Sequence, residues 1–346
     1  MRAVVVAAPG AVTIAEVPAP TLEDPADAIV RVTTAAICGS DLHFLHGRAP
    51  VAAGDVLGHE AVGVVTAVGD AVTRVAVEDR VVLSFVNACG ACWWCARGQS
   101  ALCEGSRVYG AGAFGGDLAG TQAEAVRVPA ADANLLRLPD AIDDDHAVFL
   151  GDVLPTAMAA AAMAAPAADE TVAVVGAGPV GLLTAQALRG AGTGRVVVLD
   201  REPARLALAE AAGALTVDVR DRDPEMALAA LTDDRGADAV VEAVGSVAAF
   251  GTALDVVRRG GRVVVAGMYA GEVTDLQLGV WWARALQVRF LGLCPVHAWW
   301  ETARDALLEG TIDPTPLVSH RLSLDDAAHG YDLFTRRDAT KVLLRP

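Results

Sequence analysis

The stretch Val172-Ala173-Val174-Val175-Gly176-Ala177-Gly178-Pro179-Val180-Gly181 joins an apolar run to three glycines in the spacing GxGxxG. The run Thr171–Gly176 predicts a buried strand, and Pro179–Gly190 predicts the helix that follows it. The first glycine allows a tight turn, the second lets a phosphate approach the backbone, and the third permits close helix–strand packing. Free N–H groups at the start of the helix then face an anion. The stretch therefore predicts the first strand and helix of a doubly wound sheet that binds a dinucleotide.

A carboxylate further along the chain supports this interpretation. Asp200 ends the predicted strand Arg195–Asp200, where it can accept hydrogen bonds from the hydroxyls of the adenosine ribose. Because Asp200 would repel a 2′-phosphate, the sequence favours NAD over NADP. Arg201 is the counter-argument, since a guanidinium can pair with that phosphate, but a solvated surface arginine is the simpler interpretation. The predicted cofactor-binding residues are Gly176, Gly178, Pro179, Val180, Gly181, Asp200, Arg201 and Arg205.

Alternating elements continue after this motif and predict a parallel sheet. The predicted strands are Val-rich throughout, as expected where helices cover both faces of a sheet. The further elements are expected at Pro203–Ala212 (helix), Ala237–Glu242 (strand), Ala248–Arg258 (helix), Arg262–Gly267 (strand) and Leu286–Leu293 (a sixth strand).

The first 150 residues have a different character. Short apolar runs separated by Gly, Asp and Pro are typical of an all-β region. Because 346 residues exceed what one hydrophobic core usually holds, we expect two domains. The runs are Ala28–Val32, Ala61–Val68, Arg80–Val86 and Ala123–Val128.

The composition is that of a folded, acidic protein. Hydrophobic residues make up 53% of the chain, charged residues 20%, and the formal net charge is −16. Nucleic-acid binding needs a basic surface, so no nucleic-acid partner is expected. The N-terminus shows no secretory signal, and the apolar stretch Ala157–Ala168 is too short to span a membrane and contains Pro166. We expect a cytoplasmic protein that has no membrane partner.

Four of the six cysteines lie within fifteen positions, as Cys89-x2-Cys92-x2-Cys95-x7-Cys103. In a reducing compartment such spacing favours metal over disulfides, and four thiolates can surround one tetrahedral zinc. The alternative is four unrelated reduced cysteines. With all four positions filled by protein, this zinc would be structural.

A second group of metal-ligand residues is dispersed. Cys38-Gly39-Ser40-Asp41-Leu42-His43 follows a predicted strand, and Gly58-His59-Glu60-Ala61-Val62-Gly63 opens another segment, with Gly69 beyond it. Alone, each cysteine or histidine would be interpreted as a buried residue whose hydrogen-bonding groups have partners inside the protein. Together with the four-cysteine loop and the GxGxxG motif, they resemble the zinc-containing medium-chain alcohol dehydrogenases over essentially the whole chain.

The resemblance implies a GroES-like β-rich catalytic domain and a Rossmann dinucleotide-binding domain. The expected bounds are residues 1–150, rejoined by 295–346, for the first domain and residues 151–294 for the second. It also implies two zinc ions, NAD, a small alcohol or aldehyde as substrate, and a homo-oligomer, either a dimer or a tetramer. Trp281, Trp282, Trp299 and Trp300 would shape either a pocket or an oligomer interface.

Site roles follow from the matching positions. Cys38 and His59 resemble ligands of the catalytic zinc, and Glu60 resembles a carboxylate that approaches the metal during ligand exchange. Asp41 is similar to the acceptor that orients the His59 ring. The remaining roles are Ser40 for the hydroxyl that bonds the substrate oxygen, His43 for the terminal base of a proton relay through the nicotinamide ribose, Phe85 for the substrate pocket and Lys341 for the cofactor pyrophosphate.

The chain departs from many relatives at the expected third ligand. Residues 149–156 contain no cysteine but carry Asp152 in the pattern D-x-L-P-T, which is similar to the formaldehyde dehydrogenase-like subgroup. We therefore predict Asp152 as the third protein ligand. A helix N-cap is the alternative role for Asp152, and Glu60 is the alternative ligand. Cys294 is expected to be a small buried hydrophobe, and the stretch between Cys103 and Gln122 is short for that subgroup.

Two other functions remain open from sequence. A zinc-free quinone or enoyl reductase on the same scaffold would not need Cys38, His59 or the four-cysteine loop. A non-catalytic NAD-binding protein could keep the fold without its chemistry, although it would not need Ser40 and His43.

Overall fold

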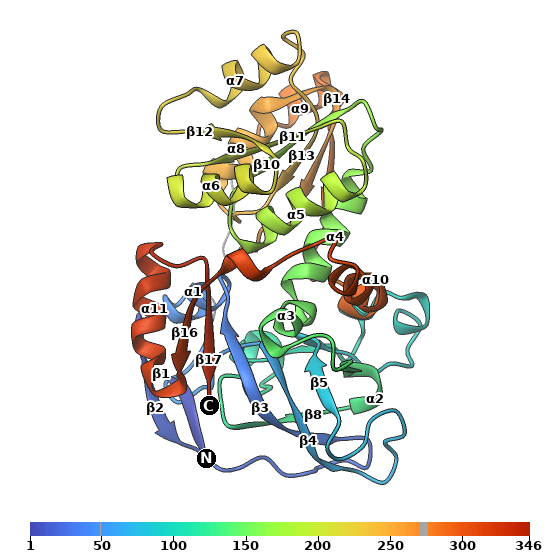
Figure 1. The fold of residues 1–346 in the computed structure, drawn as a ribbon, viewed down its shortest axis with the longest axis vertical. Coiled ribbons are helices and arrows are strands. Elements are labelled where there is room, and N and C mark those ends of the chain that lie inside the picture. The colour runs from blue at the N-terminus through green and yellow to red at the C-terminus, as the bar shows by residue number, and fades with distance from the viewer. Residues whose placement is uncertain (49, 270–275) are drawn as a thin grey trace. The chain divides into compact units, whose positions relative to one another are not determined.

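The computed structural model describes residues 1–48, 50–269 and 276–346 and divides into two compact units (Figure 1). Unit 1 comprises Met1–Pro155 and Leu293–Pro346, and unit 2 comprises Thr156–Gly292. The first boundary therefore lies at Pro155 and not at residue 150. As a consequence, Asp152 belongs to unit 1, the unit that also contains Cys38 and His59.

Unit 2 is built on a six-stranded parallel sheet of order β12-β11-β10-β13-β14-β15. The chain changes direction across the sheet between β10 and β13, and ligands bind at such a switch point, outside the carboxyl ends of the strands. The elements are β10 Thr171–Val175, α5 Pro179–Gly190, β11 Arg195–Asp200, α6 Pro203–Ala211, β12 Leu215–Asp218, α7 Pro224–Leu231, β13 Ala237–Glu242, α8 Val247–Val256, β14 Val257–Val265, α9 Leu278–Ala283 and β15 Gln287–Phe290.

One strand of unit 2 was not predicted. β12 lies at the edge of the sheet, and Val217 is its only buried residue, so it lacks the apolar run that marks the other strands. β14 begins at Val257, five residues before the predicted start at Arg262. The prediction was too short because Gly260 and Gly261 disfavour a strand when only the local sequence is considered. β15 is shorter than the predicted strand Leu286–Leu293.

Unit 1 contains a seven-stranded sheet of order β16-β17-β3-β4-β5-β9, in which β8 also pairs with β3. The last strand of the chain inserts beside β3, with Val342 opposite Ile37, while Ala36 faces Glu60 on the other side. The strands are β16 Val318–Ser323, β17 Lys341–Arg345, β3 Ala28–Ile37, β4 Glu60–Val68, β5 Arg80–Leu83, β9 Leu135–Arg137 and β8 Ala125–Val128, together with the pairs β1 Arg2–Ala8 with β2 Ala11–Glu16 and β6 Val86–Asn87 with β7 Arg107–Val108.

Helices and 3-10 turns connect these strands, and α4 (Val153–Ala164) continues into unit 2, which begins at Thr156. The predicted fold class, a β-rich domain with a doubly wound parallel-sheet domain, is confirmed. The helices are α1 Asp41–Leu45, α2 Ala131–Asn134, α3 Asp144–Ala147, α4 Val153–Ala164, α10 Val296–Leu308 and α11 Ala327–Arg336, with 3-10 turns η1 Cys95–Arg97, η2 Ser100–Leu102, η3 Gly112–Gly115, η4 Val148–Gly151, η5 Thr315–Leu317 and η6 Leu324–Asp326.

Among the described residues, no single helix has the length and apolar character needed to cross a membrane. One pair, residues 144–151 and 153–164, meets that test jointly but is bent by 53°.

Candidate active site and zinc centres

Three strand ends converge on one point of unit 1. Cys38 directly follows β3, Glu60 begins β4 and Lys341 begins β17. Because β3 pairs with β4 on one side and with β17 on the other, these three residues become neighbours although they are far apart in sequence. The register of the sheet therefore creates the site.

The catalytic ligand set predicted from sequence gathers here. One ligand atom each from Cys38, His59, Glu60 and Asp152 lies within 4.8 Å of the others. Asp152 Oδ2 lies 4.0 Å from Cys38 Sγ and 3.4 Å from His59 Nε2. Ligands of a tetrahedral zinc lie about 3.3–3.8 Å apart, and sulfur, imidazole nitrogen and carboxylate oxygen are its usual donors. The residues fit a zinc ion.

Asp152 is held at this point by buried backbone. It follows the turn η4, whose residues are all buried, and the N–H of Phe85 donates to the carbonyl oxygen of Gly151 at 2.9 Å. Gly151 itself has no room for a side chain, because a Cβ there would lie 2.7 Å from the carbonyl oxygen of Leu83. Asp152 is thus presented to Cys38 and His59 from a fixed turn.

Asp41 contacts both sides of the ligand set. Its Oδ1 lies 3.0 Å from His59 Nδ1, and its Oδ2 accepts a hydrogen bond from the Cys38 N–H at 2.9 Å. Burial disfavours a charged imidazole, but the Asp41 and Asp152 carboxylates raise the pKa of His59 well above its usual value. With an acceptor at Nδ1, the proton is favoured on that nitrogen, and Nε2, which faces Asp152, is the nitrogen that could bind a metal.

Lys341 forms a buried ion pair with Glu60. Its Nζ lies 2.6 Å from Oε1 and 2.5 Å from Oε2, and neither side chain is exposed. Burial lowers the pKa of the ammonium, but Glu60 and Cys38 outweigh it and the pKa of Lys341 is raised. The sequence-based prediction was a contact with the cofactor pyrophosphate, and in the structure the ammonium group is paired inside unit 1. This pairing was not predicted.

Two of the predicted proton-relay and pocket residues, Ser40 and Phe85, lie beside His59. Ser40 Oγ is 3.3 Å from His59 Nε2, and the Phe85 ring meets the His59 ring edge-on at 6.1 Å. Among the described residues, His43 Nδ1 is buried without a hydrogen-bond partner. Burial and the nearby charges of Arg48 and His46 lower the pKa of His43, so its ring is neutral near pH 7 and can accept a proton.

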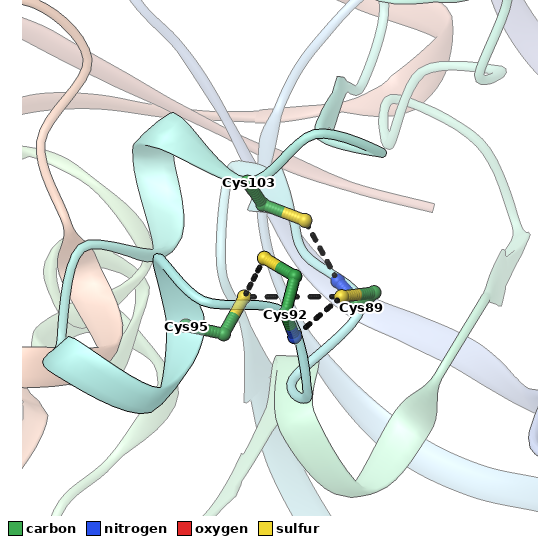
Figure 2. Close-up of side chains that lie close together, drawn as sticks. All are labelled: Cys89, Cys92, Cys95 and Cys103. Atoms are coloured by element: carbon green, nitrogen blue, oxygen red, sulfur yellow. Dashed lines mark hydrogen bonds between the residues drawn. The ribbon is translucent and has the colours of Figure 1, made fainter.

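The four predicted loop cysteines form the second cluster (Figure 2). The Cys89 and Cys95 sulfurs are 4.0 Å apart and the Cys92 and Cys95 sulfurs 3.5 Å, close to the ~3.8 Å edge of a zinc–sulfur tetrahedron. The N–H groups of Cys92 and Cys89 donate to sulfurs of the cluster, each at 3.3 Å. A backbone hydrogen bond at Cys95 lowers the pKa of Cys92 to about 6, whereas burial raises the pKa of Cys95 to about 12. Four sulfurs at tetrahedral spacing, two of which accept backbone N–H groups, form a donor set that also fits zinc.

The glycine turn of unit 2 has the backbone that a dinucleotide needs. Gly176 has φ +101°, and a Cβ at Gly181 would overlap the carbonyl oxygen of Gly176. Asp200 Oδ2 accepts from the Ala177 N–H at 2.5 Å, which ties the acidic residue to the turn. The other predicted residues lie close by in the chain: Pro179 and Val180 begin α5, Arg201 is exposed with Nε 3.4 Å from Glu202 Oε1, and Arg205 lies in α6.

Comparison with known proteins identifies the family. The model "Alcohol dehydrogenase GroES-like domain" matches residues 24–140, and "Zinc-binding dehydrogenase" matches residues 179–307. The zinc-type alcohol dehydrogenase B of Aspergillus flavus is 34% identical over 359 residues, covering 100% of this chain and 81% of the relative. The solved structure of alcohol dehydrogenase TADH from Thermus sp. ATN1 has a TM-score of 0.93 and 42% identity, covering 100% and 99%. A putative zinc-binding dehydrogenase from Sinorhizobium meliloti 1021, solved bound to NADP, has a TM-score of 0.86 and 31% identity, covering 100% and 99%.

The chain therefore belongs to the zinc-containing medium-chain alcohol dehydrogenase family. It is a zinc-dependent oxidoreductase of small-molecule alcohols that uses a nicotinamide cofactor, and the predicted family and activity are confirmed. Membership of the formaldehyde dehydrogenase-like subgroup stays a prediction.

Proposed function

We propose that this chain transfers hydride between an alcohol, or a hydrated aldehyde, and NAD, with Cys38, His59 and Asp152 as the protein ligands of the catalytic zinc. The observation that carries the proposal is the gathering of these three ligand atoms in unit 1, with Ser40 Oγ beside them. Glu60, paired with Lys341, is proposed to stay off the metal until a ligand exchanges.

The residues around this cluster then have defined tasks. When bound, zinc would supply a Lewis acid for the substrate oxygen, and the nicotinamide cofactor would supply the hydride acceptor. Ser40 Oγ would hydrogen-bond the substrate hydroxyl, and the neutral His43 ring would be the final acceptor of the proton. Asp41 orients His59, and Phe85 excludes water from one side of the substrate.

Oxidation assays test this proposal directly. A panel of primary alcohols, secondary alcohols, polyols and aldehydes with both nicotinamide cofactors should give alcohol-dependent NADH formation with at least one substrate class. A zinc-free reductase would instead reduce quinones or enones after complete metal removal, and a non-catalytic protein would bind the cofactor without turnover.

We predict that NAD is preferred over NADP because of Asp200. Its carboxylate accepts from three backbone N–H groups, those of Ala177, Arg201 and Glu202, which hold a negative charge where a 2′-phosphate would lie. Asp200→Gly should shift the ratio of kcat/KM values toward NADP by about 10-fold or more, the equivalent of ~1.4 kcal/mol or more.

Two further variants isolate the charge effect. Asp200→Asn keeps the shape of the side chain, and Asp218→Asn removes the carboxylate in register with Asp200 on the next strand. Only the substitutions at Asp200 should change the ratio. A wild-type enzyme that uses NADP with the higher kcat/KM would overturn the assignment.

A homo-oligomeric, cytoplasmic enzyme is also proposed. β15 ends the sheet of unit 2, and Trp282, Phe290 and Leu278, in and near this edge, are exposed by 85%, 69% and 63%. On its outer side β15 has no neighbouring strand among the described residues, and such an edge beside large apolar side chains favours pairing with a second copy of the chain. The cytoplasmic location is proposed because zinc-binding cysteines must stay reduced, and the cytoplasm is a reducing compartment. Sedimentation would distinguish monomer, dimer and tetramer.

A further inference from the structure

Two buried polar side chains in unit 1 have no role in the reaction described above. Gln122 precedes β8 and Tyr331 lies in α11, 209 residues later, and their side chains are 0% and 2% exposed. The Tyr331 hydroxyl donates to Gln122 Oε1 at 2.9 Å. Gln122 Nε2 in turn donates to the carbonyl oxygen of Ala36 at 3.1 Å and to Asp41 Oδ2 at 3.3 Å.

The partners determine the direction of these hydrogen bonds. Nε2 faces two groups that can only accept, a backbone carbonyl and a carboxylate, so the amide nitrogen must lie at that end of Gln122. The other end is then an oxygen, and Tyr331 must be the donor. Burial and the charge of Asp41 raise the pKa of Tyr331 well above its usual value, so its hydroxyl keeps the proton that it donates.

The chain of contacts ends on a zinc ligand. Asp41 Oδ2 accepts hydrogen bonds from Gln122 Nε2 and from the Cys38 N–H. Asp41 Oδ1 lies 3.0 Å from His59 Nδ1. The segment just before His59 is shaped to admit Gln122, because Gly58 has φ +92° and a Cβ there would overlap the Gln122 side chain. The backbone of Gln122 also donates to the Leu57 carbonyl oxygen at 3.0 Å.

We propose that Tyr331 and Gln122 are positioning residues that hold the Asp41 carboxylate and, through it, set the His59 ring for the catalytic zinc. The inference deepens the proposed function and depends on His59 being a zinc ligand. A carboxylate that accepts two hydrogen bonds on Oδ2 keeps one orientation, so its Oδ1 stays 3.0 Å from His59 Nδ1 and favours one tautomer of that ring. Helix α11, remote in sequence, thereby contributes to metal affinity.

Tyr331→Phe tests this with little change in shape. Loss of a partner that directly contacts a ligand typically costs 10–100-fold in metal affinity, so removal of a group one step further out should weaken catalytic zinc binding by about 3- to 10-fold. Chelator competition measures the dissociation constant, and the zinc of the four-cysteine cluster is an internal reference that should not change. With cobalt in the catalytic site, the visible absorption bands should also shift.

Tyr109→Phe is the matched control. Tyr109 is buried in the same unit, and its hydroxyl donates to the carbonyl oxygen of Arg127 at 3.4 Å, outside the Asp41 network. The Tyr109→Phe substitution should lower the melting temperature without changing the affinity of the catalytic site for zinc. In an Asp41→Asn background, Tyr331→Phe should have no further effect on zinc affinity, because the coupling passes through Asp41.

Gln122→Met provides a second variant of similar length, and it should weaken catalytic zinc at least as much as Tyr331→Phe. The proposal is overturned if both variants fold and bind catalytic zinc as wild type does, or if Tyr331→Phe has the same effect with and without Asp41. Failure of the proposed function would appear separately, as a wild-type protein without a second zinc or without alcohol-dependent NADH formation.

Discussion

Asp152→Ala is expected to remove the catalytic zinc and to lower kcat/KM on the order of 1,000-fold, while the fold is retained. Without this carboxylate only Cys38 and His59 remain as ligands, one short of the three that an open zinc site uses. Asp152 Oδ2 is the atom that lies near both, 4.0 Å from the sulfur and 3.4 Å from the nitrogen. Metal analysis and steady-state kinetics on the same preparation measure both effects.

The alternative role for Asp152 is a helix cap, and the chain provides a control for it. Asp143 is a structural N-cap, whose side chain accepts from the His146 N–H at 3.0 Å. Asp143→Ala should cost about 1 kcal/mol of stability and no zinc. If Asp152→Ala behaves in the same way, with its second zinc and its activity retained, Asp152 is a cap and Glu60 becomes the candidate third ligand.

Lys341→Met is expected to cause the largest loss of stability, about 3–5 kcal/mol in the free energy of unfolding. The substitution leaves the Glu60 carboxylate buried without its cation, in a site that already holds Cys38 and Asp152. Burial raises the pKa of Glu60, and Lys341 is the main group that opposes this. Without Lys341, the carboxyl group should take up a proton or move onto the metal. Urea denaturation measures the loss.

A second substitution distinguishes an unpaired charge from lost packing. Glu60→Gln combined with Lys341→Met should recover much of the stability, because no isolated charge remains. Arg336→Ala, which breaks an exposed pair with Asp332, should cost no more than ~1 kcal/mol. If the double variant is as unstable as Lys341→Met, the ion pair does not explain the loss.

The parts of this molecule that could be predicted from sequence depend on residues that are close together in the chain. The GxGxxG turn, the strand β11 that ends at Asp200 and the four-cysteine loop each carry their chemistry within a short segment. β12 could not be found in the same way, because an edge strand that buries only Val217 has no apolar pattern.

The rest of the site depends on sheet register and on packing between distant segments. Lys341 reaches Glu60 because β17 inserts beside β3, which no local pattern indicates. Gln122 and Tyr331 are separated by 209 residues, and neither lies in a motif that the resemblance uses. The candidate ligands Cys38, His59 and Asp152 were inferred from family resemblance, and their proximity is visible only in the folded chain.

Stepwise removal of zinc from the wild-type protein tests most directly whether activity depends on a catalytic zinc that is distinct from the structural one. Zinc content and alcohol-dependent NADH formation are followed in the same samples during titration with a chelator. We expect two zinc ions per chain at the start, loss of all activity as the content falls to one, and recovery when zinc is restored. Full activity in protein that carries one zinc ion or none would contradict this expectation.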